Sequence, residues 1–154
     1  MAPRREPRHS LLSSSPPAST GTRAGAAVLA LLLLVVLSLA AWLTPATAGF
    51  GTHRQLGLPP CTWARAFGRP CVTCGMTTSF SHAANLDVRA SVLTQPMGFV
   101  LALLAATLVW PLLHVATTGS NVGTLILKCA NGKSGVLLVV LLLAAWAYKV
   151  VTWG

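Results

Sequence analysis

Three long runs of apolar residues alternate with polar segments along this chain. They cover residues 25–44, 97–118 and 135–153, and the first run contains no charged residue. A helix rises about 1.5 Å per residue, so runs of this length match the roughly 30 Å hydrocarbon core of a bilayer. Because backbone polar groups in lipid must be hydrogen-bonded within their own segment, such runs form helices. The pattern therefore predicts an all-α integral membrane protein with three transmembrane helices.

Polar and aromatic residues modify the second and third runs. Pro111 removes one helical hydrogen bond, so we expect a kink in the second helix. His114 is expected to bond a neighbouring backbone group or water rather than to serve as a proton or ligand site. Lys149 lies near the end of the third run, where its ammonium is expected to reach the headgroup region. Aromatic residues typical of that region lie toward the ends of the runs: Trp42, Trp110, Trp146, Tyr148 and Trp153.

The composition agrees with a membrane protein and excludes two classes of function. Hydrophobic residues make up 54% of the chain and charged residues 8%, against about 25% charged residues in an ordinary soluble domain. The formal net charge is +9, but the cations are scattered near the ends of the apolar runs, so we expect no binding of nucleic acid. The two acidic residues, Glu6 and Asp87, lie far apart in the sequence, which leaves no carboxylate pair for acid and base catalysis.

The first apolar run also has an alternative interpretation as a secretion signal. A basic tail precedes it, and the small residues Ala46 and Ala48 that follow are typical of a signal peptidase site. The run is longer than the roughly 7 to 15 apolar residues of a signal core, so we favour a retained helix over cleavage after Ala48. Residues 1–24, with a Ser- and Pro-rich stretch at 13–20, are predicted to be a disordered basic tail.

The distribution of cations predicts the orientation in the membrane. The basic tail before the first helix usually dominates, which places the N-terminus in the cytoplasm. We therefore predict a multi-pass protein of the cell inner membrane, with segment 45–96 and the C-terminus outside and a polar loop, 119–134, inside. Cys129 in that loop is then a reduced thiol that cannot pair with the other cysteines. The cations on the cytoplasmic side are Arg4, Arg5, Arg8, Arg23, Lys128 and Lys133.

The connecting segment, residues 45–96, is expected to contain two short helices that lie in the membrane interface. Thr73 is a candidate cap for a helix from near Cys74 to about Ala84. Asp87 is well placed to cap a second helix over residues 88–94, after which Pro96 can begin the second transmembrane helix. Short amphipathic helices beside a bilayer lie in the interface rather than forming a separate domain.

The same segment carries a specific sequence motif. It reads PCVTCGMTTSF over residues 70–80, is preceded by Cys61, and is followed by NLDVRAS and QPMGF. This pattern resembles the bacterial domain-of-unknown-function family number 2752, whose small membrane proteins share a Cys-Pro-x-Cys-Gly-Met-Thr-Arg core. The resemblance covers about residues 49–118, and it implies no particular activity. The residues that keep the family pattern are Cys61, Cys71, Cys74, Gly75 and Met76, and those that depart from it are Val72, Thr78, Asn85, Leu86 and Gln95.

Three kinds of chemistry suit the cysteines of this motif. Cys71 and Cys74 have the spacing of a redox pair, and the start of a helix would stabilise a thiolate there, with Cys61 as a resolving thiol. The same three cysteines also suit a tetrahedral Zn²⁺ site. In the third interpretation they form a structural disulfide with one cysteine left free. Covalent haem attachment is excluded, because Gly75 stands where that motif requires histidine.

A zinc site would need a fourth ligand besides the three cysteines. The nearest histidines in the sequence are His53, in a Gly-flanked loop, and His82, on the expected helix after the motif. Either imidazole suits Zn²⁺, so both are candidate metal ligands. A second Cys-x-x-Cys pair, as found in zinc ribbons, is missing from the sequence.

These observations favour a non-enzymatic structural or assembly protein of the membrane. Its expected partners are the lipid bilayer and either another membrane protein or further copies of itself, because small membrane helices associate through packing within lipid. A membrane-associated thiol–disulfide redox protein using Cys71 and Cys74 is the first alternative. A zinc-binding cysteine cluster is the second, and no other cofactor is expected.

Overall fold

The computed structural model describes residues 18–120 and 132–153, and this part of the chain is all-helical, without strands. Three of its helices are long and apolar enough to cross a membrane, which confirms the predicted fold class. Residues 1–17 of the expected tail and Cys129 of the expected loop lie outside the described residues. The three long helices are α1 (Thr20–Trp42), α5 (Pro96–Thr118) and α7 (Gly132–Val151).

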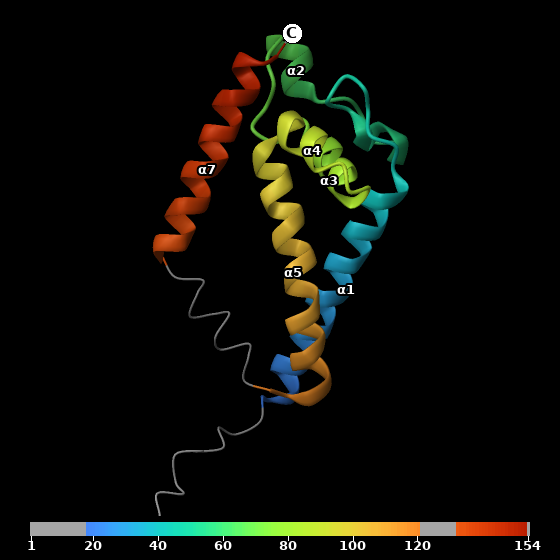
Figure 1. Cartoon of the computed structure of the whole chain (residues 1–154), viewed down its shortest axis with the longest axis vertical. Coiled ribbons are helices and arrows are strands. Elements are labelled where there is room, and N and C mark those ends of the chain that lie inside the picture. The colour runs from blue at the N-terminus through green and yellow to red at the C-terminus, as the bar shows by residue number, and fades with distance from the viewer. Residues whose placement is uncertain (1–17, 121–131, 154) are drawn as a thin grey trace, which may run out of the picture.

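Helices α1 and α5 run side by side in opposite directions (Figure 1). At one end, the guanidinium of Arg23 donates to the carbonyl oxygens of Ala116 (3.1 Å) and Thr117 (2.9 Å), which are at the end of α5. Ser19 caps α1 by accepting a hydrogen bond from the backbone N–H of Thr22 (3.2 Å). This cap begins the helix at Thr20, five residues before the Gly25 that the apolar run indicated.

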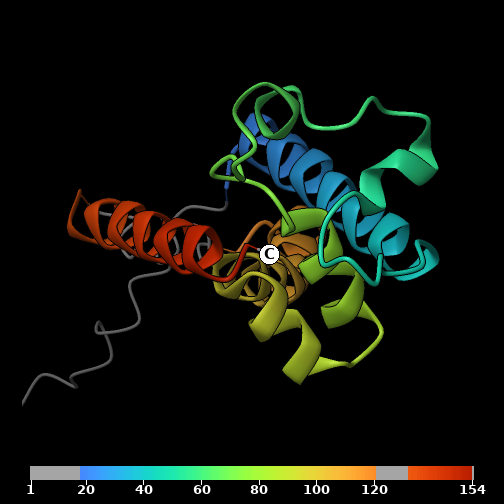
Figure 2. The ribbon, with the colours of Figure 1, turned by 90° about the horizontal axis from the view of Figure 1, so that it is seen from above.

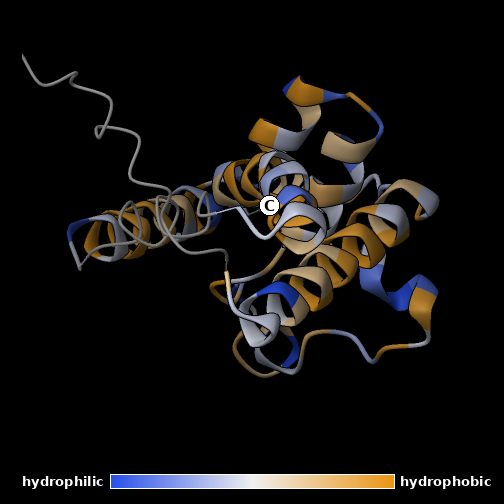
Figure 3. Cartoon of the chain, turned by 90° about the horizontal axis from the view of Figure 1, so that it is seen from below, coloured by the Kyte–Doolittle hydropathy of each residue, from blue (hydrophilic) through white to orange (hydrophobic). Residues whose placement is uncertain are grey.

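Helix α7 leans away from α1 and α5 and comes closest to α5 toward its own C-terminal end (Figures 1 and 2). There the indole N–H of Trp146 donates to the carbonyl of Pro70 (3.2 Å), and the hydroxyl of Tyr148 donates to the carbonyl of Leu93 (3.0 Å). The long helices are apolar along most of their length, as Figure 3 shows. The C-terminal end of α7 is therefore held by the segment that contains the cysteines.

Lys149 is a buried residue near the end of α7. Its side chain is only 7% exposed. The ammonium Nζ donates to the carbonyl oxygens of Gly49 (3.3 Å) and Thr94 (3.2 Å). A buried ammonium is costly unless it is hydrogen-bonded, and these two carbonyls provide the compensating bonds.

Four short helices cover the ends of α1 and α5 (Figure 1). Within this cap, α3 packs against α1, α4 and α5 through buried hydroxyl groups. Ser79 Oγ lies 2.9 Å from Ser91 Oγ and donates to the Gln95 carbonyl (2.9 Å), and Thr52 and Thr78 share a hydrogen bond of 2.8 Å. The four helices are η1 (Thr52–Leu56), α2 (Thr62–Phe67), α3 (Met76–Ala84) and α4 (Val88–Thr94).

Two of the three helix starts expected in this segment agree with the structure. The carboxylate of Asp87 accepts from the N–H of Ala90 (3.0 Å) and begins α4 at Val88, and Pro96 is the first residue of α5. The expected cap at Thr73 is wrong. Helix α3 begins at Met76 after Gly75, which has a positive φ of 86° and no side chain to cap with. The hydroxyl of Thr73 lies instead 3.4 Å from the sulfur of Cys71.

Candidate functional site: a three-cysteine cluster beside a cationic cleft

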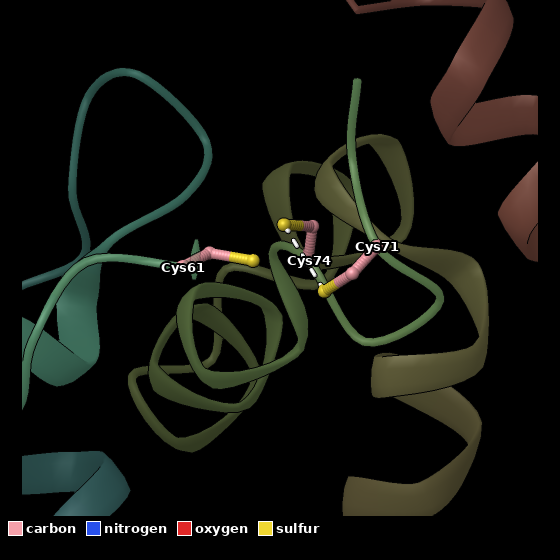
Figure 4. Close-up of side chains that lie close together, drawn as sticks. All are labelled: Cys61, Cys71 and Cys74. Atoms are coloured by element: carbon pink, nitrogen blue, oxygen red, sulfur yellow. Dashed lines mark hydrogen bonds between the residues drawn. The ribbon is translucent and has the colours of Figure 1, made fainter. Parts of the chain in front are cut away.

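The structure brings Cys61, Cys71 and Cys74 together at the start of α3 (Figure 4). Their three sulfur atoms all lie within 4.8 Å of one another, and those of Cys71 and Cys74 are 3.4 Å apart in a hydrogen bond. Cys61 comes from a different segment, where it is the residue before α2. All three are free thiols in this structure.

A tight turn positions Cys71 and Cys74. The N–H of Cys74 donates to the carbonyl of Cys71 (3.1 Å), and the N–H of Met76 donates to the carbonyl of Thr73 (3.1 Å). Gly75 completes the turn with a positive φ, a conformation that residues with a side chain adopt only at a cost. A Cβ atom at Gly75 would lie 2.8 Å from the carbonyl oxygen of Gly49, so this position also requires the absence of a side chain.

Cys71 and Cys74 have opposite tendencies to ionise. Cys74 is only 6% exposed, and its burial, together with the hydrogen bond to Cys71, raises its pKa from 9.0 to about 12. Partial burial also opposes ionisation of Cys71, but hydrogen bonds from Thr73, Cys74 and Cys61 outweigh it and hold the pKa of Cys71 below its usual value. The pair therefore combines a partly exposed thiol that ionises readily with a buried thiol that keeps its proton.

The two candidate histidines are not part of this cluster. Among the described residues, the group of side chains close enough to share a metal ion consists of the three cysteines alone. His53 Nε2 lies 3.2 Å from the carbonyl oxygen of Pro59, and His82 Nδ1 lies 3.5 Å from the carboxylate of Asp87. His114 is on the exposed surface of α5, away from the cysteines in the chain.

A cleft of about 1200 Å³ opens beside the cysteines. All three cysteines line it, together with His53 and Arg54 from η1 and Arg65 from α2. No Asp or Glu is among its lining residues. A molecule that enters this cleft can therefore reach the thiol groups, and it meets cationic side chains on the way.

Lys149 is a component of the site that the sequence patterns did not identify. A Cβ atom at Gly75 would lie 3.4 Å from its Nζ, so its ammonium is next to the turn that follows Cys74. One sequence feature could have indicated it: Lys149 is the single charged residue in the third apolar run. A charge within a membrane helix is rare and usually faces protein or water.

Two positions that depart from the family pattern contact each other. The amide Nε2 of Gln95 donates to the carbonyl oxygen of Val72, which lies between the cysteines of the pair, at 3.4 Å. The Gln95 side chain is fully buried, and its Oε1 has no hydrogen-bond partner. Gln95 therefore links the start of α5 directly to the loop that carries Cys71 and Cys74.

Comparison with known proteins confirms the resemblance seen in the motif. A family model described as "Protein of unknown function (DUF2752)" matches residues 61–109, from Cys61 into α5, and this part of the chain is similar to that family. The match includes all three cysteines of the cluster. Neither the curated proteins nor the solved structures contain a match to the chain.

Proposed function

We propose that this chain is a membrane-bound thiol–disulfide exchange protein in which Cys71 is the attacking thiol and Cys74 the resolving thiol. The supporting observation is the asymmetry of the pair: two sulfurs 3.4 Å apart, one partly exposed with a lowered pKa and one buried with a raised pKa. A structural disulfide or a purely packing role, the leading interpretation from the sequence, would not need this difference or an open cleft beside the thiols.

The exchange reaction needs only the two thiols and a disulfide substrate. The Cys71 thiolate attacks one sulfur of the substrate, a Cys71–substrate disulfide forms as the substrate S–S bond breaks, and the other half leaves as a thiolate that takes up a proton. Cys74 then loses its proton and attacks Cys71 Sγ, which releases the second half as a thiol. The Cys71–Cys74 disulfide forms, and two electrons have passed from the protein to the substrate.

Cys61 extends this chemistry to a third thiol. Its sulfur lies within 4.8 Å of both others, although its chain segment is separate. A disulfide between Cys71 and Cys74 can therefore be attacked by Cys61 after a small movement of the side chains. We propose Cys61 as an exchange partner that passes the disulfide between the pair and the loop before α2.

The reduction potential of the pair tests the proposal. We expect a value between about −120 and −270 mV, as in exchange proteins, whereas structural disulfides lie below about −300 mV. The detergent-solubilised Cys129→Ser protein is equilibrated in graded glutathione and dithiothreitol buffers, and alkylation of the thiols is read as a gel shift. A bond that resists all but the most reducing buffers would show a structural disulfide and contradict the proposal.

A zinc site is a second candidate function, favoured by the convergence of three sulfurs within 4.8 Å. Zn²⁺ accepts three protein ligands with water as the fourth, and here the cleft would provide access for that water. The same titration separates the two functions. Thiols that are protected from alkylation by one equivalent of zinc, and exposed again by a chelator, would indicate the metal site instead.

We further propose that the cysteine cluster lies on the outer side of the cell inner membrane. Helix α3, at whose start the cluster lies, and the C-terminal end of α7 are at the same end of the long helices (Figure 1). The start of α1, where Arg23 contacts the end of α5, is at the opposite end. A membrane-impermeant maleimide added to intact, pre-reduced cells is expected to label Cys61 or Cys71 and to leave Cys129 unlabelled. In permeabilised cells, which serve as the control, Cys129 is expected to be labelled. Labelling of Cys129 alone in intact cells would indicate the opposite orientation.

A further inference from the structure

We infer that the cleft beside the three cysteines selects disulfides that carry carboxylate groups. This inference rests on the proposed exchange function and specifies its substrate class. Arg54 and Arg65 line the cleft from two different elements, η1 and α2, and Cys71 lines it as well. A carboxylate-bearing disulfide whose sulfur approaches Cys71 therefore has a guanidinium available within the same cleft.

The other charged groups near the cleft are not available to bind the carboxylate of a substrate. Lys149 is buried, and its ammonium is hydrogen-bonded to the carbonyl oxygens of Gly49 and Thr94, so it is not free to bind a substrate. Asp87, the acidic residue within the described part of the chain, lies 3.5 Å from His82 at the far end of α3 and is not among the residues of the cleft.

Cations are needed here because the attacking group is itself negative. An anionic disulfide is repelled by the Cys71 thiolate, and the negative charge then spreads over three sulfurs during the exchange. Guanidinium groups in the cleft offset both effects, and they raise the local concentration of anions. A cationic disulfide gains nothing from such a site.

The test compares three small disulfides of similar chemistry and different charge. They are 3,3′-dithiodipropionate (anionic), 2-hydroxyethyl disulfide (neutral) and cystamine (cationic). Cys61→Ser with Cys74→Ser, in the full-length Cys129→Ser protein, removes both neighbouring thiols that could resolve the Cys71 mixed disulfide. The mixed disulfide therefore accumulates, and its rate of formation is measured by mass spectrometry. The protein is held in a non-ionic detergent at low ionic strength, where surface charges act over the longest distance.

Replacing both cations, Arg54→Gln with Arg65→Gln, is expected to slow the anionic disulfide about tenfold and to accelerate the cationic one, with the neutral one unchanged. The matched control, Arg89→Gln with Lys133→Gln, removes the same net charge at positions outside the cleft and should leave all three rates unchanged. Equal effects of the two double variants on the anionic disulfide would overturn the inference.

Two further results keep the inference and the proposed function distinguishable. If the neutral disulfide fails to modify Cys71 even in the protein with both arginines, the exchange function is wrong and the inference falls with it. If the arginine variant reacts slowly with all three disulfides, its structure has changed. The inference is then tested by how the rates of the protein with both arginines depend on ionic strength. The anionic rate must then fall with added salt while the cationic rate rises, and salt-independent rates would overturn the selection.

Discussion

Cys71 is expected to react with iodoacetamide at least about thirtyfold faster than Cys74 at pH 7 in the Cys129→Ser protein, where all three cysteines of the cluster are present. The pKa of Cys71 lies below 9.0 and that of Cys74 at about 12. At pH 7 the fraction of Cys71 that is thiolate is therefore at least about a thousandfold larger than that of Cys74. The Cys74 thiolate is the more basic and the more reactive of the two, but this offsets only part of the difference. The burial of Cys74 slows its reaction further.

The pH dependence of these rates identifies the cause. The Cys71 rate should rise with pH and level off once the pH exceeds its lowered pKa, whereas the Cys74 rate should still be rising at about pH 11. Both rates are measured in the Cys129→Ser protein by mass spectrometry of its peptides after brief alkylation, so that all three cysteines of the cluster stay in place. Equal rates, or a Cys74 rate that levels off at a lower pH than the Cys71 rate, would contradict the roles proposed for the two thiols.

Gly75→Ala is expected to cost about 2–5 kcal/mol of folding free energy and to expose Cys74 to alkylation. Two effects add at this position. Alanine at a φ of 86° adopts a left-handed conformation that costs about 1–2 kcal/mol, and its Cβ would lie 2.8 Å from the Gly49 carbonyl oxygen, an overpacking of about 1–3 kcal/mol. The Gly49 loop must then move, and the hydrogen bond from Lys149 to that carbonyl is weakened.

Gly57→Ala is the matched control for Gly75→Ala. Gly57 has a positive φ of 76°, but a Cβ atom there has no other atom within 4 Å, so this change brings the backbone cost of about 1–2 kcal/mol without the steric one. Stability is measured by thermal unfolding in detergent, and accessibility of Cys74 by its rate of alkylation. If both variants lose the same stability and leave Cys74 protected, Gly75 is needed for its backbone conformation alone.

The transmembrane helices and two of the helix starts were predictable from the sequence because their causes are local. A long uncharged run has one favourable structure in lipid, since its backbone groups must bond to one another. The Asp87 cap and the start at Pro96 depend on residues within one helical turn, and both agree with the structure. The motif around Cys71 and Cys74 likewise indicated the family whose model matches residues 61–109, because it is a contiguous stretch of residues.

The tertiary structure decided how these local parts combine into a site. The sequence proposed Cys61, His53 and His82 as companions of Cys71 and Cys74, but it contains no information on where a loop and a helix face meet. Of these three residues, the structure brings Cys61 to the pair. Lys149 and Gly49 are 100 residues apart in the chain, and only the packing of α7 against the cap brings them together. That contact, the close approach of the Gly49 carbonyl to Gly75 and the burial that raises the pKa of Cys74 all come from packing between distant segments. Such packing depends on the whole fold rather than on any short stretch of sequence.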